Sequence, residues 1–115
     1  MSITRLHTNQ KLSRIVVHND TVYLCGQVAS DFSAGIAEQT RQTLAKIDEL
    51  LAEVGSDKSK LLSVTVYVKD VALIDEMNTQ WFAWLPEGQA PARTCVAADF
   101  GLPEILVEMT VTAAK

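Results

Sequence analysis

The 115-residue sequence has few of the residues that build metal and disulfide sites, with only two histidines and two cysteines. His7 and His18 have no partner at a metal-ligand spacing, and neither do Cys25 and Cys95. Both cysteines lie in apolar, strand-like runs, which makes a structural disulfide improbable in a reducing compartment. We therefore expect a protein that uses no metal and no other cofactor.

Long apolar runs and clusters of positive charge are also missing from the sequence. No segment approaches the ~20 apolar residues that a membrane span needs, and residues 1–14 lack the apolar core of a signal peptide. Ten Lys and Arg residues against fourteen Asp and Glu give a formal charge of −4, which repels phosphate backbones. We expect a soluble, cytoplasmic protein that binds neither membranes nor nucleic acid.

Apolar patterns in the first half of the chain predict a hairpin and a helix. Residues 14–26, RIVVHNDTVYLCG, are two β-branched runs around the turn residues HND, and residues 3–6 are also rich in β-branched side chains. Apolar residues from Ile36 to Val54 recur at helical spacings, and Gly55 then supplies a stop signal. These patterns place a β-hairpin before the first helix.

The second half predicts three further strands and one helix. Strands are expected at 61–68 (LLSVTVYV), 92–98 (ARTCVAA) and 105–114 (ILVEMTVTAA). Asp70 can cap a helix in which Ile74, Met77 and Trp81 share one face. The order β, β, α, β, α, β, β with short connections predicts one α+β domain over residues 1–115, with both helices on one face of the sheet.

The other face of this predicted sheet is poor in charge as well, because the runs IVV, VTVYV and MTV carry few polar side chains. A monomer would expose this face to water, and large exposed apolar patches usually mark interfaces. The sequence therefore predicts a homo-oligomer in which sheets pack together.

Two charged residues interrupt apolar strands, Arg93 in PARTCV (91–96) and Glu108 in VEMTVTAA (107–114). Alternation along a strand puts Arg93 and Cys95 on one face, and puts Glu108 opposite to Val107 and Met109. A buried charge is costly unless it is paired or serves a ligand. Two interpretations stay open: an Arg93–Glu108 salt bridge or an exposed strand face, and an arginine that captures a carboxylate ligand.

These residues resemble a known family. PARTCV, followed fifteen residues after Arg93 by Glu108, looks like the C-terminal signature of the RidA/YjgF family of imine deaminases. YLCGQV, VTVYVKD and MNTQWFAW resemble further segments of that family, so the likeness covers nearly the whole chain. The short chain, the compact QVASDFSAG loop and the stretch GSDKSKLLSVTVYVKD are most similar to its small YoaB-type branch.

The resemblance implies a fold and an activity. It implies a homotrimer of chorismate-mutase-like fold, with three sheets forming a central β-barrel, helices outside and ligand sites in clefts between subunits. The implied reaction is hydrolytic deamination of 2-imino or enamine acids to 2-keto acids and ammonia. One such substrate is 2-aminoacrylate, which dehydratases that use pyridoxal phosphate release. This activity would remove a reactive metabolite.

The same resemblance implies roles for individual residues. Arg93 would bind the substrate carboxylate, and Glu108 would hold or activate the attacking water. The backbone at Cys95 would hydrogen-bond the imine nitrogen, and Gly26 would let the backbone come close to the ligand. Asn78 matches a helix position near the family's cleft, although an asparagine in the middle of a helix is more often solvent-facing.

Two positions depart from the family pattern. Leu12 stands where deaminating members usually carry a tyrosine over the ligand, and Cys25 stands where they usually carry serine. The lost hydroxyl groups leave a second hypothesis open: a trimer that binds a small carboxylate metabolite without turnover and acts as a regulator or interaction partner. RNA cleavage has also been attached to parts of the family, but the acidic charge of this chain makes it the weakest interpretation.

Overall fold

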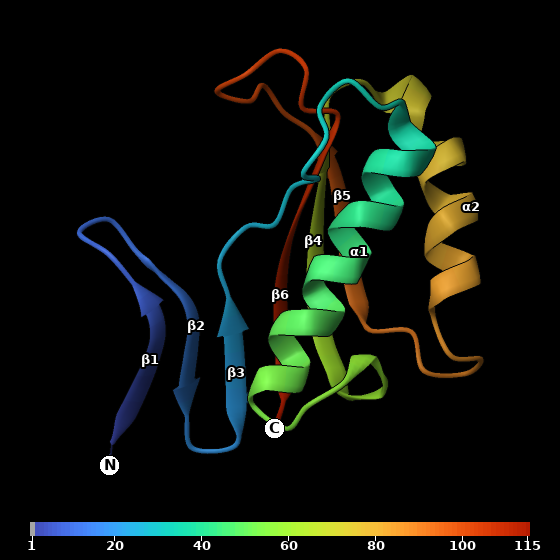
Figure 1. The fold of residues 1–115 in the computed structure, drawn as a ribbon. Helices are drawn as coiled ribbons and strands as arrows, with labels where there is room; N and C mark the ends of the chain where they lie inside the picture. Colours follow the sequence, from blue (N-terminus) through green and yellow to red (C-terminus); the bar gives the residue numbers. More distant parts are fainter. Residues whose placement is uncertain (1) are drawn as a thin grey trace.

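Six strands of one mixed sheet and two helices make up the computed structural model of the chain, which describes residues 2–115 (Figure 1). The strands are β1 (Ile3–Thr8), β2 (Ser13–His18), β3 (Thr21–Leu24), β4 (Leu61–Val68), β5 (Ala92–Ala97) and β6 (Val107–Ala114). The helices are α1 (Ile36–Glu53) and α2 (Ile74–Trp84), with short 3₁₀ turns at Lys58–Lys60 and Val71–Leu73. The strand order across the sheet is β1-β2-β3-β6-β4-β5.

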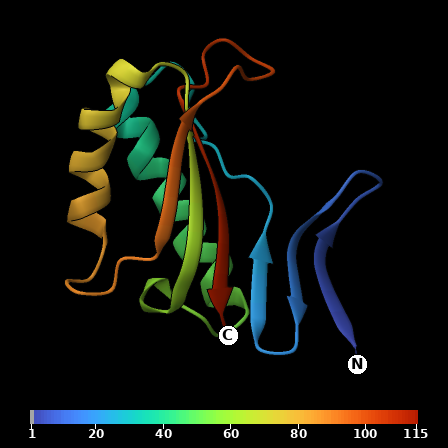
Figure 2. The ribbon, with the colours of Figure 1, turned by 180° about the vertical axis from the view of Figure 1, so that it is seen from behind.

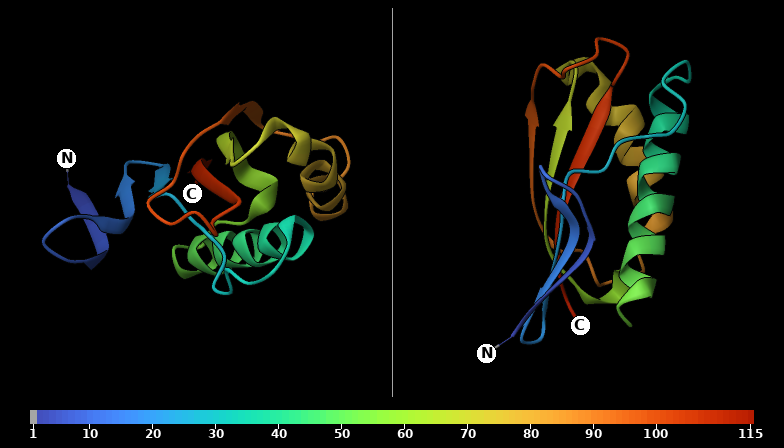
Figure 3. Two further views of the ribbon diagram at one scale, coloured as in Figure 1. Left: turned by 90° about the horizontal axis from the view of Figure 1, so that it is seen from above. Right: turned by 60° about the vertical axis from the view of Figure 1, so that its left-hand side comes forward.

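The molecule has two layers, with both helices on one face of the sheet, as the sequence predicts. Figure 2 shows the uncovered face from behind, and the right-hand view of Figure 3 shows the sheet and the helices edge-on. Strand β1 extends past the helices, and five of its six residues are exposed (Figures 1 and 3). Strand β2 still contributes Ile15 and Val17 to the buried core. All strand pairs are antiparallel except β4 and β5, which are parallel and joined through α2.

The core lies between the helices and the covered face of the sheet. Leu44, Ile47 and Leu51 on one side of α1 are fully or almost fully buried, and they belong to the same cluster as Val66 and Met109 of the central strands. Burying side chains of this size contributes about 1.5–3 kcal/mol each relative to leaving them in water. This burial holds β4 and β6 in place. Strand β6 carries Glu108, and β4 pairs with β5, which carries Arg93.

Most elements agree with the sequence predictions, with three differences. Helix α1 and strand β4 lie within a residue of their predicted bounds, whereas β6 begins at Val107, two residues later than predicted. Asp70 caps the 3₁₀ turn at Val71–Leu73, which then continues into α2. The predicted order also placed two strands before α1, whereas the structure has three, because β1 adds an edge strand to β2.

Gln39 is a polar side chain buried completely between α1 and the segment before β6. Its Nε2 donates to the carbonyl oxygens of Ala34 and Glu104, both at 3.0 Å, and its Oε1 accepts from the Leu106 N–H at 3.0 Å. The amide thus satisfies backbone groups that would otherwise be buried without partners. It also ties α1 to the chain that leads into β6 and Glu108.

We expect Gln39→Ala to lower the free energy of unfolding by about 3 kcal/mol, because it leaves buried backbone groups unsatisfied and creates a cavity. Chemical denaturation at fixed protein concentration measures this change. Gln80→Ala, at a half-buried position on the other helix, is the matched control. Equal stabilities of the two variants would contradict the structural role given to Gln39.

Within residues 2–115, no helix is both long and apolar enough to cross a membrane.

Candidate functional site

Arg93 points to the helix-covered side of the sheet. In the parallel pair of β4 and β5 it lies opposite the buried Val64, and its side chain reaches α2. There Nη1 donates to Asn78 Oδ1 at 2.7 Å, and Cζ lies 5.3 Å from the centre of the Trp81 ring. A guanidinium has five N–H donors. One is used in these contacts, which leaves donors for a ligand at the edge of the sheet.

Glu108 points to the opposite face. It lies opposite Tyr67 in the antiparallel pair of β4 and β6 and alternates with the fully buried Val107 and Met109. One of the alternatives left open by the sequence, an Arg93–Glu108 salt bridge within the chain, is therefore wrong, because the two side chains leave the sheet on different faces with β4 between their strands. The interpretation of Asn78 as a solvent-facing residue is also wrong, since it is half-buried and holds Arg93.

The side chain of Cys95 lies on the same face as that of Arg93, but the backbone of Cys95, not its thiol, is available to bind a ligand. Burial raises the pKa of the Cys95 thiol, and the nearby Arg93 cation opposes this only in part. The thiol is therefore protonated at neutral pH and is a poor nucleophile. The Ala98 N–H donates to the Val68 carbonyl of β4, and alternation then directs the N–H and C=O of Cys95 to the unpaired edge of β5.

Gly26 makes room for Glu108. A Cβ atom added at Gly26 would lie 2.2 Å from Oε2 of Glu108 and 3.0 Å from its Cδ, both too close. The glycine follows β3, at the point where the chain leaves the strand and Gln27 bridges to Met109 of β6. The sequence predicts that this glycine admits a ligand to the backbone. In the structure it admits the carboxylate of Glu108 instead.

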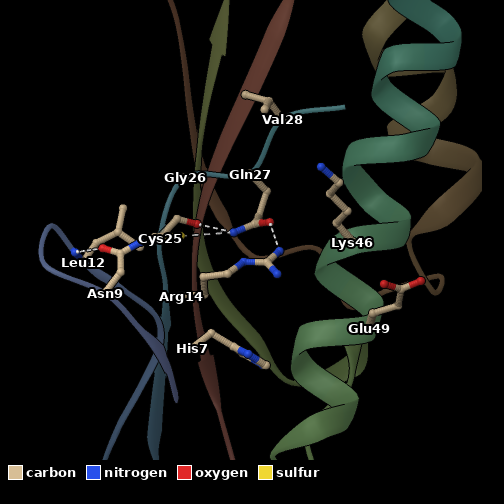
Figure 4. Close-up of a pocket in the computed structure, with 10 residues that line it drawn as sticks. All are labelled: His7, Asn9, Leu12, Arg14, Cys25, Gly26, Gln27, Val28, Lys46 and Glu49. Atoms are coloured by element: carbon tan, nitrogen blue, oxygen red, sulfur yellow. Dashed lines mark hydrogen bonds between the residues drawn. The ribbon is translucent and has the colours of Figure 1, made fainter. Parts of the chain in front are cut away.

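Leu12, Cys25 and Gly26 line one pocket of about 540 Å³ (Figure 4). The pocket lies between the β1–β2 hairpin, the end of β3 and α1. Leu12 is 44% exposed, and in Figure 4 it lies on the other side of Cys25 from α1. Cys25 and Cys95 are both free thiols. Glu108 itself lines a smaller pocket of about 240 Å³ on the uncovered face, together with Tyr67 and Phe100.

The predicted site residues, together with Trp81, thus form two separate groups. We call Asn78, Trp81, Arg93 and Cys95 the Arg93 cluster, and Leu12, Cys25, Gly26 and Glu108 the Gly26 wall. Strands β3 and β5, which carry parts of the two groups, are three strand spacings apart, or about 14 Å. A small carboxylate ligand cannot touch both groups in one chain.

Sequence reasoning missed all the polar side chains that line the larger pocket, which are His7, Asn9, Arg14, Gln27, Lys46 and Glu49. Arg14 gave a usable signal, because it is a charge at the start of the apolar run IVV, as Arg93 is in its own strand. Lys46 gave none, since it fits the solvated face of a helix. Within residues 2–115, no three His, Cys, Asp or Glu side chains come together as a metal-binding group.

Known proteins match this chain along its whole length. Residues 2–115 match the family model described as "Endoribonuclease L-PSP". The "RutC family protein YoaB" of Escherichia coli is 39% identical over 114 residues, which cover 99% of both chains. A RutC family protein of Haemophilus ducreyi is 38% identical over 112 residues, or 97% of this chain and 96% of that protein.

Solved structures agree with the sequence matches. A YjgF family protein from Neisseria meningitidis has a TM-score of 0.96 at 41% identity, and the match covers 100% of this chain and 96% of that one. A protein from Pseudomonas aeruginosa has the same TM-score and identity, with 99% of both chains covered. The sequence resemblance is thereby confirmed at the level of the family: this chain belongs to the YjgF/RutC family.

Proposed function

We propose that this protein hydrolyses 2-imino and enamine acids to 2-keto acids and ammonia at a site shared by two copies of the chain. The observation that carries the proposal is the division of the site residues into the Arg93 cluster and the Gly26 wall. The Arg93 cluster supplies an anchor for the substrate carboxylate, and the Gly26 wall supplies Glu108 to hold the attacking water. A carboxylate anchor without a water-activating group, or the reverse, cannot catalyse this hydrolysis efficiently. Joining the two groups across a subunit interface completes the site.

Arg93 is the carboxylate anchor in this proposal. Its guanidinium is stacked near Trp81 and held at one nitrogen by Asn78, which restricts its orientation before a ligand arrives. A fixed, planar fork binds a carboxylate through two parallel hydrogen bonds and loses little conformational entropy in doing so. The anchored substrate would then lie along the unpaired edge of β5, where the backbone of Cys95 can bond to the imine nitrogen.

Glu108 of a neighbouring copy would hold the attacking water. The water oxygen bonds to the imine carbon and gives one proton to Glu108, while the π electrons of the C=N bond move to nitrogen, which takes up a proton. In the resulting carbinolamine the hydroxyl proton is transferred to nitrogen, the C=O bond forms as the C–N bond breaks, and ammonia leaves. One water is consumed and no electrons are transferred, so the residues only need to orient the reactants and stabilise charge.

The uncovered face of the sheet supports assembly into a trimer of chorismate-mutase-like fold, with the three sheets forming a central barrel. Tyr23 is 45% exposed and alternates with the buried Val22 and Leu24, and Val96 is 42% exposed on the strand face opposite to Cys95, so both side chains lie on the uncovered face. Half-buried Thr65, Thr110 and Thr112 add uncharged surface. Packing such faces together would remove apolar area from water and bring clusters on different chains into contact.

A second candidate function is favoured by Leu12. A leucine in the Gly26 wall contributes no hydroxyl group for positioning a ligand or water, so the shared site would bind a small carboxylate metabolite without turning it over. The Arg93 anchor is common to both candidates. RNA cleavage, the activity named in the description of the matching family, is less well supported because the chain carries a net charge of −4.

Ammonia release from imino acids tests the proposal directly. An amino-acid oxidase generates 2-iminobutyrate in the assay, and a dehydratase generates 2-aminoacrylate. We expect the wild-type protein to accelerate the loss of both above the rate in buffer. Rates equal to buffer, combined with measurable binding of 2-oxobutyrate, would instead establish the binding function without catalysis.

A further inference from the structure

The pocket behind the Gly26 wall contains two cations that a short imino acid does not need. Arg14 of β2 and Lys46 of α1 both line it, and both are half-buried. Figure 4 shows Lys46 and Glu49 projecting from α1 toward the side of the pocket where Arg14 and Gln27 lie. Because a short imino acid has one carboxylate, and Arg93 takes it in the proposed function, these cations have no ligand group to bind.

Arg14 is fixed beside the Gly26 wall by a chain of hydrogen bonds. Its Nη2 donates to Gln27 Oε1 at 3.2 Å. The Gln27 side chain is 3% exposed, and its Nε2 donates to the Cys25 carbonyl at 2.9 Å and lies 3.3 Å from the Cys25 sulfur. Since the amide nitrogen is held by Cys25, the amide oxygen is directed to Arg14. The guanidinium is thus placed next to a residue of the proposed site.

The charges of the pocket favour an anion. Within residues 2–115, no carboxylate lies within salt-bridge distance of Arg14 or Lys46, whereas His7 at the same pocket is paired with Glu53 at 2.7 Å. Glu49 is the one carboxylate that lines the pocket, and it is exposed, so water and salt screen its charge. Two half-buried cations against one exposed carboxylate leave a positive site in a protein of net charge −4.

We propose that Arg14 and Lys46 bind a second carboxylate, so that the shared site prefers imino acids with an acidic side chain. Such 2-imino dicarboxylic acids are formed when the α-amino group of an acidic amino acid is oxidised. This inference rests on the proposed function, because the first carboxylate is the one held by Arg93. The cavity of about 540 Å³ is large enough for the longer side chain, which would extend from Gly26 toward α1.

The test compares two imino acids in five proteins. Oxidases generate 2-iminosuccinate and 2-iminobutyrate in the assay, and kcat/KM is measured for each with the wild type, Arg14→Gln, Lys46→Gln and two controls. The controls are Arg5→Gln and Lys60→Gln, which neutralise exposed cations away from the pocket. We expect the wild type to prefer 2-iminosuccinate. The ratio of the two kcat/KM values should fall about tenfold in each pocket variant and stay at the wild-type value in both controls.

Binding gives a readout that does not depend on turnover. We expect 2-oxoglutarate to bind more tightly than 2-oxobutyrate, and Arg14→Gln to remove the difference in a ligand-observed NMR titration. A kcat/KM ratio and a binding difference that both survive in the two pocket variants would overturn the inference. If the wild type hydrolyses neither imine, the proposed catalytic activity is wrong. The titration then still decides whether this pocket binds a second carboxylate.

Discussion

Arg93→Ala is expected to lower kcat/KM for 2-iminobutyrate by about 10²- to 10³-fold, the range seen when one preorganised charged or polar donor is removed from a reacting group. The guanidinium makes few contacts that stabilise the fold, since its one side-chain hydrogen bond goes to the half-buried Asn78. Steady-state kinetics at a verified oligomeric state measures the effect.

Two further variants serve as controls. One tests whether the planar guanidinium of Arg93 matters beyond its charge, and the other tests whether the loss of an arginine elsewhere lowers activity. Arg93→Lys keeps the charge but loses the planar fork and its stacking on Trp81, so its activity should lie between those of the wild type and the alanine variant. Arg41→Ala removes an exposed arginine that pairs with Glu38 on α1, and it should behave as the wild type. An Arg93→Ala variant with full activity would exclude Arg93 as the anchor.

Mixing two inactive variants is expected to restore activity if the site is shared between copies. Arg93→Ala lacks the anchor and Glu108→Gln lacks the carboxylate, so each variant alone has only defective sites. In mixed cyclic oligomers, an interface between the intact Arg93 of one copy and the intact Glu108 of the next is complete. Random mixing of equal amounts should make about one quarter of the sites complete.

The experiment requires exchange of subunits, which co-expression with two affinity tags provides. Sedimentation should give the mass of a trimer for the wild type and for the mixture. Combining Arg93→Ala with the double variant Arg93→Ala/Glu108→Gln is the control, because no interface in that mixture has an intact arginine. Activity that stays at the level of the single variants would show that both residues act within one copy, against the separation of their strand faces.

Local patterns in the sequence predicted most of the fold. The first helix and the strand at 61–68 have strong apolar periodicity, and the turn residues HND give the hairpin, so these elements needed no tertiary information. The sequence marked residues 3–6 as rich in β-branched side chains but did not count them as a strand. Five of the six residues of β1 are exposed in the structure, so this edge strand has no buried apolar face. His7, with φ 54°, also interrupts its alternation: Leu6 pairs with Ile15 and Thr8 with Ser13.

The arrangement of the site could be predicted only in part. Alternation correctly gave Arg93 and Cys95 a common face, and Glu108 the face opposite to Met109. Helix α2 connects β4 to β5, and the two strands pair in parallel. This pairing decides which face of β5 lies under the helices. No local pattern contains this information, so the two charges looked like a pair. The contact between Gly26 and Glu108 joins residues 82 positions apart and was hidden for the same reason.

The unpaired edge of β5 also affects the solubility of the protein. A free strand edge exposes backbone groups that can pair with another chain, and native sheets often protect such edges with charged side chains that point inward. Arg93 is such a side chain, on a strand whose neighbouring residues Thr94 and Val96 are uncharged and exposed. Arg93 therefore also protects this edge of the sheet against pairing with other chains, and an uncharged residue at this position should make the protein more prone to aggregation.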